Sequence, residues 1–101
     1  MDNKRELRTA VLNVTSAGTA EPLSSVPKHV WQVRVKATAG NTGIIYIGDS
    51  TVSSANGYSL SEKEEIDISA IFAKDNFILD LNEIYIDSSV NGEGVSLAYL
   101  E

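Results

Sequence analysis

One stretch of the sequence decides the expected fold, and it reads Gly40-Asn41-Thr42-Gly43-Ile44-Ile45-Tyr46-Ile47-Gly48-Asp49-Ser50. Its pattern returns near the C-terminus as Glu83-Ile84-Tyr85-Ile86-Asp87-Ser88. Each copy is a short aliphatic-tyrosine-aliphatic run that stops at a polar pair, which is typical of a β-strand entering a turn. Neither copy contains a histidine or a thiol, so the pattern favours binding or assembly over catalysis.

The composition fits one globular domain with an aliphatic core. The chain has 101 residues, of which 43% are hydrophobic and 7% aromatic. Its interior is therefore expected to consist mostly of Val, Ile and Leu, as in a β-sandwich. There is no cysteine, which excludes disulfides and thiolate metal sites. A small domain without disulfides fits a cytosolic origin, or stabilisation by its neighbours in an assembly.

The clearest strand is predicted at residues 30–37, where polar and apolar side chains alternate. Val33 and Val35 fall on the same face as Trp31, because successive residues of a strand point to opposite faces. We expect this face to be buried, with Trp31 as the largest anchor of the core. The glycine-containing turn that follows predicts a hairpin with the strand at residues 44–48.

Turn-forming residues divide the rest of the chain into further short strands. About seven strands are predicted in all, at residues 8–14, 30–37, 44–48, 58–60, 65–69, 83–87 and 95–100. Residues 77–81 fit either a strand or an irregular crossing, and the last two strands are expected to pair as a hairpin around residues 88–94. The spacing predicts an all-β fold, an antiparallel β-sandwich of jelly-roll or immunoglobulin-like form. We expect residues 1–7 to be a flexible polar arm and residues 8–101 to be a single β-sandwich domain.

Charge is divided unevenly along the chain. Residues 1–40 contain six basic and three acidic side chains, for a net charge of +3, whereas residues 41–101 contain two basic and eleven acidic ones, for −9. The total of −6 argues against nucleic acid as a partner, since phosphate contacts need a basic face. The acidic residues either solvate strand edges and turns or complement a neighbouring protein surface. No run approaches the ~20 apolar residues of a membrane span, and no signal peptide is recognisable.

Two features resemble catalytic or metal sites, and neither completes one. His29 is the only histidine, and the sequence places beside it no nucleophile that it could activate as a general base. Residues 87–93 read Asp-Ser-Ser-Val-Asn-Gly-Glu, like the start of a calcium loop, but the twelfth position is Ala98 instead of the required glutamate. The sequence therefore predicts no enzymatic activity, no metal and no cofactor.

Three tyrosines in predicted strands, Tyr46, Tyr58 and Tyr85, are candidate contact residues. Tyrosine is amphipathic, so it suits both stacking against a ligand and contact with another protein. The three side chains could form a stacking platform for sugars or bases. In a sandwich, a position on the sheet surface at a protein interface is the favoured interpretation.

Two parts of the chain resemble small virion proteins of tailed bacteriophages. In those proteins a Tyr-hydrophobic-Gly strand is followed by Val-Ser, by Asn-Gly-hydrophobic-x-Leu, and finally by a Tyr-hydrophobic-Asp and Gly-x-Gly-Val-Ser hairpin. The matching residues are Tyr46-Ile47-Gly48, Val52-Ser53, Asn56-Gly57-Tyr58-Ser59-Leu60, Tyr85-Ile86-Asp87 and Gly92-Glu93-Gly94-Val95-Ser96. The resemblance extends over residues 28–100.

The resemblance implies a non-enzymatic β-domain displayed in many copies, and a capsid decoration (cement) protein that stabilises the head fits it best. Such a protein is made in the host cytoplasm and binds the capsid surface, with the major capsid protein or other virion proteins as partners, as a homo-oligomer such as a trimer. Lys4, Arg5 and Arg8 would attach the arm to acidic capsid groups. The alternatives are a head–tail connector, a tail component, or a module that binds cell-surface carbohydrate.

Overall fold

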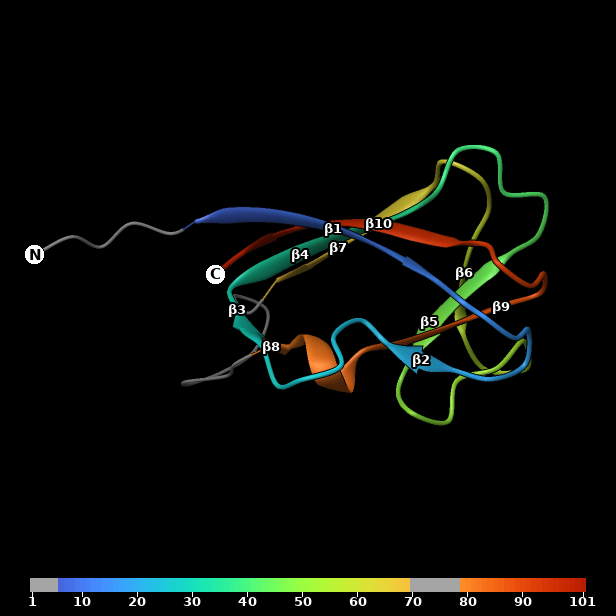
Figure 1. The fold of residues 1–101 in the computed structure, drawn as a ribbon, viewed down its shortest axis with the longest axis horizontal. Helices are drawn as coiled ribbons and strands as arrows, with labels where there is room; N and C mark the ends of the chain where they lie inside the picture. Colours follow the sequence, from blue (N-terminus) through green and yellow to red (C-terminus); the bar gives the residue numbers. More distant parts are fainter. Residues whose placement is uncertain (1–5, 70–78) are drawn as a thin grey trace, which may run out of the picture.

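The computed structural model describes residues 6–69 and 79–101. Within these ranges the chain forms antiparallel β-sheets and no α-helix (Figure 1). The helical element in this part of the chain is a single 3-10 turn, η2 (Leu81–Glu83), for which Asp80 provides the N-cap. The expectation of an all-β, antiparallel protein is therefore confirmed.

The first sheet, called sheet A, contains four strands in the spatial order β1, β10, β4, β7. These strands are β1 (Leu7–Asn13), β10 (Gly94–Leu100), β4 (Gln32–Ala37) and β7 (Glu65–Ser69). All neighbours pair antiparallel. Alternate residues of β4 and β10 are buried, as expected for strands that have one face on the core.

The second sheet, called sheet B, has the spatial order β2, β9, β5, β6. Its strands are β2 (Glu21–Pro22), β9 (Tyr85–Ser88), β5 (Ile45–Gly48) and β6 (Tyr58–Leu60). A separate two-stranded ladder pairs β3 (His29–Val30) with β8 (Leu79–Asp80). In Figure 1, sheet A runs along the upper side of the molecule, and sheet B and η2 lie below it.

A single core of buried hydrophobic side chains joins the two sheets. The largest fully buried members include Val33, Val35 and Val95 from sheet A and Ile45 and Ile86 from sheet B. One core supplied by two antiparallel sheets is the arrangement of a β-sandwich. The full cluster consists of Val14, Leu23, Val30, Val33, Val35, Ala37, Ile45, Ile47, Leu60, Leu79, Leu81, Ile86, Val95, Leu97 and Tyr99.

The prediction that Trp31 anchors the core is wrong, because Trp31 is 52% exposed. The chain bends at Trp31, between β3 and β4. Val30 and Val33 are both buried, so two residues, instead of one, separate consecutive core positions. The backbone N–H of Trp31 donates to the carbonyl of Leu100 (2.8 Å), which fixes this bend at the end of sheet A. A local bend of this kind interrupts the period of two from which the prediction was made.

Both predicted hairpins are also wrong in their partners. The strand at 44–48 pairs in sheet B, whereas β4 lies in sheet A, and β9 and β10 are likewise in different sheets. The two loops that make these crossings meet each other: Asn41 Nδ2 donates to the Gly94 carbonyl, and the Glu93 carboxylate accepts from the backbone N–H of Gly43. Alternation indicates which face of a strand is buried, but it carries no information about which strand lies beside it.

The described residues contain ten strands, of which β2, β3 and β8 have two residues each. Two-residue ladders are too short to show a period in sequence, so the predicted set omitted them. β1 begins at Leu7, one residue before the predicted start. Lys4 and Arg5 of the predicted arm lie outside the described residues, as does the first part of the ambiguous segment 77–81.

Candidate interaction surface

The most exposed large hydrophobic residues of sheet A lie on its edge strand β1. Leu7 is 66% and Val11 is 67% exposed. They project from the outer face of the sheet, since Val11 lies opposite Ser96 and Leu7 opposite Leu100, neither of which is a core position. The alternate residues on this side, called the β1 row, are Leu7, Thr9, Val11 and Asn13. The row is uncharged, and in the described part of the chain β1 pairs only with β10.

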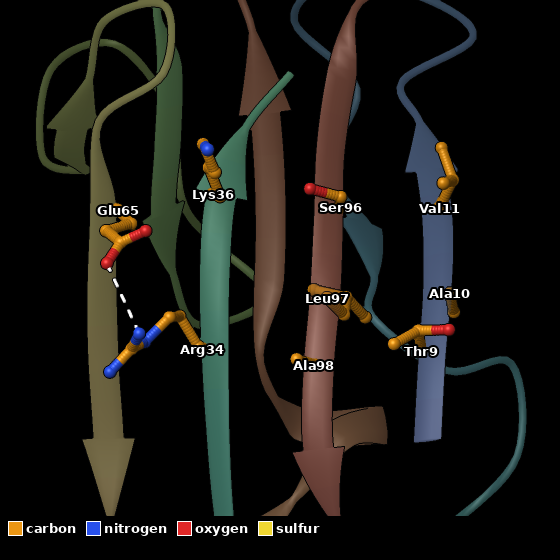
Figure 2. Close-up of a pocket in the computed structure, with 9 residues that line it drawn as sticks. All are labelled: Thr9, Ala10, Val11, Arg34, Lys36, Glu65, Ser96, Leu97 and Ala98. Carbon is orange, nitrogen blue, oxygen red and sulfur yellow. Dashed lines mark ion pairs between the residues drawn. The ribbon is translucent and has the colours of Figure 1, made fainter. Parts of the chain in front are cut away.

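A groove runs over β10 on the same outer face, beside the β1 row (Figure 2). Its floor is made by the small residues Ser96 and Ala98, and its far side is made by Arg34 and Lys36 of β4. The volume of about 330 Å³ lies at the low end of the ~300–1,000 Å³ typical of small-molecule sites. A second depression continues the groove toward Leu7. An elongated groove on an open sheet face suits an extended polypeptide better than an enclosed small molecule.

The β7 side of this face carries an ion-pair network. Arg34 makes two hydrogen bonds to the Asp67 carboxylate, at 2.7 and 3.2 Å. Its Nη1 also lies 3.5 Å from a Glu65 carboxylate oxygen, the ion pair drawn in Figure 2. These hydrogen bonds from Arg34 hold the pKa of Asp67 below its ordinary value. The Gln32 side chain adds a longer contact to Asp67 (3.4 Å). Both acidic outer residues of β7 therefore contact the same arginine of the neighbouring strand.

Arg8, one of the three predicted attachment residues, also lies in an ion-pair network. Its guanidinium contacts the carboxylates of Glu6 and Glu101, each at 3.0 Å, and Lys28 Nζ lies 3.2 Å from Glu101. Hydrogen bonds from Arg8 and then Lys28 lower the pKa of Glu101. Arg8 thus joins the start of β1 to the C-terminus. Lys4 and Arg5, the other two attachment candidates, lie outside the described residues.

The three candidate tyrosines do not share one face. Tyr46 lies opposite Asp87, two residues from Tyr85, so these two tyrosines project from the outer face of sheet B. Tyr58 lies opposite Ile47, a core position, and is therefore on the inner side of the edge strand β6, where it is still 59% exposed. The structure brings Tyr46 and Tyr85 together and places Tyr58 apart from them.

The loop at residues 49–57 covers part of the outer face of sheet B. Val52 of this loop is 5% exposed although it is not part of the main core. A Cβ at Gly48 would lie 2.9 Å from Val52 Cγ2, and one at Gly57 would collide with Tyr46 Cβ. Both glycines are thus needed for close packing, and Tyr46 lies against the loop backbone. The Val-Ser and Asn-Gly pattern of this region forms a structural cover for β5.

His29 lies at an exposed strand end. Its Nε2 is 3.8 Å from Asp80 Oδ2, and its side chain is 63% exposed. Asp80 accepts hydrogen bonds from the backbone N–H groups of Lys28 and Asn82, which lower the pKa of its carboxyl group. Asp80 therefore caps η2 and binds the backbone at Lys28. His29 lies near it only at the surface.

The carboxylates of the calcium-like segment bind backbone groups. Asp87 is 3% exposed and accepts a hydrogen bond from the N–H of Gly18 (2.9 Å). Glu93 accepts from the N–H groups of Thr42 (2.7 Å) and Gly43 (2.8 Å), and these bonds lower its pKa. Within residues 6–69 and 79–101 no group of three or more His, Asp or Glu side chains is placed to hold a metal ion. The segment is a structural connection that ties three loops together.

Two surface features were missed in the sequence: the exposed Trp31 and the open edge of β1. The exposure of Trp31 had no signal in the sequence, because the bend depends on tertiary contacts. The open edge of β1 did have one, since each face of the strand mixes apolar and polar residues and neither is apolar throughout. The burial pattern agrees, with Leu12 the one partly buried residue of the strand.

Neither a membrane-spanning helix among the described residues nor a related protein accounts for this surface. No helix in the part of the chain that the structure describes is long and apolar enough to cross a membrane. No protein-family model, no curated protein and no solved structure matches the chain.

Proposed function

We propose that the chain is a non-enzymatic structural protein of a tailed-bacteriophage virion, used in many copies as a capsid decoration protein. The observation that carries this proposal is the exposed β1 row beside an open strand edge. Leu7 and Val11 expose most of their surface to solvent, and unprotected apolar edges are uncommon in soluble monomers because they invite strand addition. A protein that is covered by its neighbours in a particle has a use for such an edge.

A jelly-roll form is the finer fold that we propose. The eight strands of the two large sheets pair first with last and then inward: β1 with β10, β2 with β9, β4 with β7, and β5 with β6. A long antiparallel strip with this pairing, rolled into two four-stranded sheets, gives the orders β1-β10-β4-β7 and β2-β9-β5-β6. Double-sheet jelly rolls are common in viral capsid proteins and lectins, which supports a virion role and also keeps a sugar-binding role in view.

Attachment through the N-terminal arm is part of the proposal. The arm leads into β1 at the end of the molecule where Arg8, Lys28 and Glu101 meet. Because Arg8 is already paired with two carboxylates, we assign the larger share of attachment to Lys4 and Arg5. Acidic capsid groups that bind these two residues would be screened by salt over about 10 Å at 0.1 M.

The test uses the full-length purified chain with intact empty heads and isolated tails from the phage that encodes it. Co-sedimentation should show saturable binding to heads, and that binding should weaken as salt rises. The variant Lys4→Glu with Arg5→Glu should bind heads less tightly. The matched variant Lys36→Glu, on the outer face away from the arm, should bind as the unmodified chain does if the arm is the attachment site.

Two other outcomes would replace the proposal. Binding to tails but not to heads would make the chain a tail or connector component. Binding to a glycan array, with no affinity for either particle, would favour a carbohydrate module, for which the exposed Trp31 and Tyr58 are the first residues to substitute.

A further inference from the structure

We infer that the open edge of β1 binds the β1 strand of a second copy of this chain in antiparallel orientation. The pair would be a two-fold symmetric dimer in which two four-stranded A sheets join into one continuous sheet. This inference concerns the free protein in solution, and it holds or fails independently of any role in a virion.

The first support is the direction of the backbone groups of β1. Two hydrogen bonds at the ends of the β1–β10 ladder show which residues form hydrogen-bonded pairs. Val14 N–H donates to the Glu93 carbonyl, and Glu101 N–H donates to the Glu6 carbonyl. Bonded pairs in an antiparallel ladder recur at every second residue. The even-numbered residues of β1 are therefore bonded to β10. The residues of the β1 row direct their N–H and C=O groups to the open edge. The same row includes the two exposed apolar side chains.

The second support is the fit of β1 to itself. An antiparallel pair centred on Ala10 matches the strand over its whole length, because Ala10 is the midpoint of Leu7–Asn13. Thr9 then lies opposite the partner's Val11, and Leu7 lies opposite the partner's Asn13. All of these are β1-row positions whose backbone groups face the edge, so each pair can exchange two hydrogen bonds. An interface in which the same patch serves both subunits is the commonest kind in homodimers.

The charges of β1 are compatible with this register. Arg8 lies opposite the partner's Leu12, so no two like charges face each other, and Arg8 is neutralised in its own chain by Glu6 and Glu101. At the centre, Ala10 meets the partner's Ala10 at a non-hydrogen-bonded position, where the Cα atoms of a strand pair approach to about 4.5 Å. A small side chain suits this close approach.

The other sheet edges are poor partners for β1. The open positions of β7 carry Glu65 and Asp67, β2 contains Pro22, and β6 has three residues. Charged side chains, proline and short length are the usual protections against strand addition. In the described part of the chain, β1 is the long edge whose open positions carry neither charge nor proline, since Arg8 occupies a position bonded to β10. A second β1 is therefore the partner that we choose over a different edge of a neighbouring copy.

The expected dimer is weak and depends on salt in a distinctive way. A seam one strand long is smaller than the ~800 Å² per partner of a standard stable interface, so the dimer should dissociate on dilution. Each copy has a net charge of −6, and this repulsion is screened by salt. Dimerisation should therefore strengthen as salt rises, whereas attachment of a basic arm to an acidic surface should weaken.

Sedimentation equilibrium of the full chain over a range of concentrations tests the dimer. Thr9→Pro removes an N–H that faces the open edge and leaves the β1–β10 hydrogen bonds in place, and we expect the dimer dissociation constant to rise at least about tenfold. Glu65→Pro is the matched control, since it removes an edge-facing N–H at the first position of β7. It should leave the dimer unchanged. Circular dichroism establishes that both variants keep the fold.

The register is tested by cysteine cross-linking, which leaves the backbone N–H and C=O groups of β1 in place. The chain has no cysteine, so Ala10→Cys introduces a single thiol beside its symmetry mate. Mild oxidation should join two Ala10→Cys chains and should leave Leu7→Cys chains unlinked, because Leu7 is far from the partner's Leu7 in this register. A chain that stays monomeric at all concentrations, a dimer or trimer insensitive to Thr9→Pro, or linking of Leu7→Cys in place of Ala10→Cys would each overturn the inference.

Discussion

The two edges of sheet A are built in opposite ways. β1 has seven residues, and its outer row is uncharged, with Leu7 and Val11 largely exposed. β7 has five residues, and its outer positions Glu65 and Asp67 are acidic and paired with Arg34. Charge on an edge strand discourages the addition of another strand. The difference supports our inference that another strand adds at β1 and not at β7.

The largest expected loss of stability comes from a core residue of β10, the strand that pairs with β1. Leu97 of β10 is 3% exposed and lies opposite Ala10 on one side and Val35 on the other. Leu97→Ala should lower the free energy of unfolding by ~2–5 kcal/mol, because it removes buried methyl groups and leaves a cavity. Denaturant unfolding followed by circular dichroism measures this change. A loss below about 1 kcal/mol would show that β10 does not anchor the open edge to the core.

A second substitution should loosen the β1 edge without loosening the β7 edge. A Cβ at Gly94 would lie 2.6 Å from Asn13 Cα and would collide with the Leu12 carbonyl oxygen. Gly94→Ala should therefore cost ~1–3 kcal/mol, as overpacking usually does. Hydrogen exchange should show faster exchange at Leu12, with amides of β7 unchanged. Equal acceleration in both strands would mean that the two edges unfold as one unit.

The charged edge should respond to pH. Arg34 lowers the pKa of Asp67 from an ordinary value of 3.8, so the pair adds stability that is present above this value and is lost as pH falls through the folded pKa. The unfolding free-energy difference between the unmodified chain and Arg34→Gln should be constant near neutral pH and shrink below about pH 4. Because both side chains are exposed, the difference should be small. A difference that persists in acid would assign the effect of Arg34 to its packing.

The smallest effect is expected in the β1 row itself. In a dilute, monomeric sample Val11→Ser should change the free energy of unfolding by less than ~0.5 kcal/mol, since Val11 is 67% exposed. Ile66 of β7 packs against the core, so Ile66→Ser should cost more. Thermal unfolding of the two variants side by side gives the comparison. If Val11→Ser proved the more damaging, the β1 row would have to be covered within the monomer.

Much of the architecture could be predicted from alternation and turns. The strand expected at 65–69 coincides with β7 and the one at 58–60 with β6. These segments have clear boundaries, because glycine, serine and charged turn residues flank each apolar run. The pairing of the strands could not be predicted in the same way. The segments at 30–37 and 44–48 are neighbours in sequence and belong to different sheets, because the loops between them cross from one sheet to the other.

The candidate surface was less accessible to prediction. Tyr46 and Tyr85 were expected as contact residues, and they share one face, but Tyr58 lies on the other side of the sheet. Arg8 was assigned to a partner, and the structure pairs it with Glu6 and Glu101. The glutamate at the C-terminus is 93 residues away from Arg8 in sequence, so no local pattern could have revealed that pair.

The sequence by itself determined the class of this protein: an all-β chain with aliphatic strands, polar turns, no thiol chemistry and a net charge of −6. These properties depend on local preference and on the two-residue period of a strand, which are written in neighbouring residues. Only the tertiary structure decided that Trp31 turns outward and that β1 forms an open edge with an exposed apolar row. Both depend on which distant strand pairs with which, and that choice is made by the burial of the whole core.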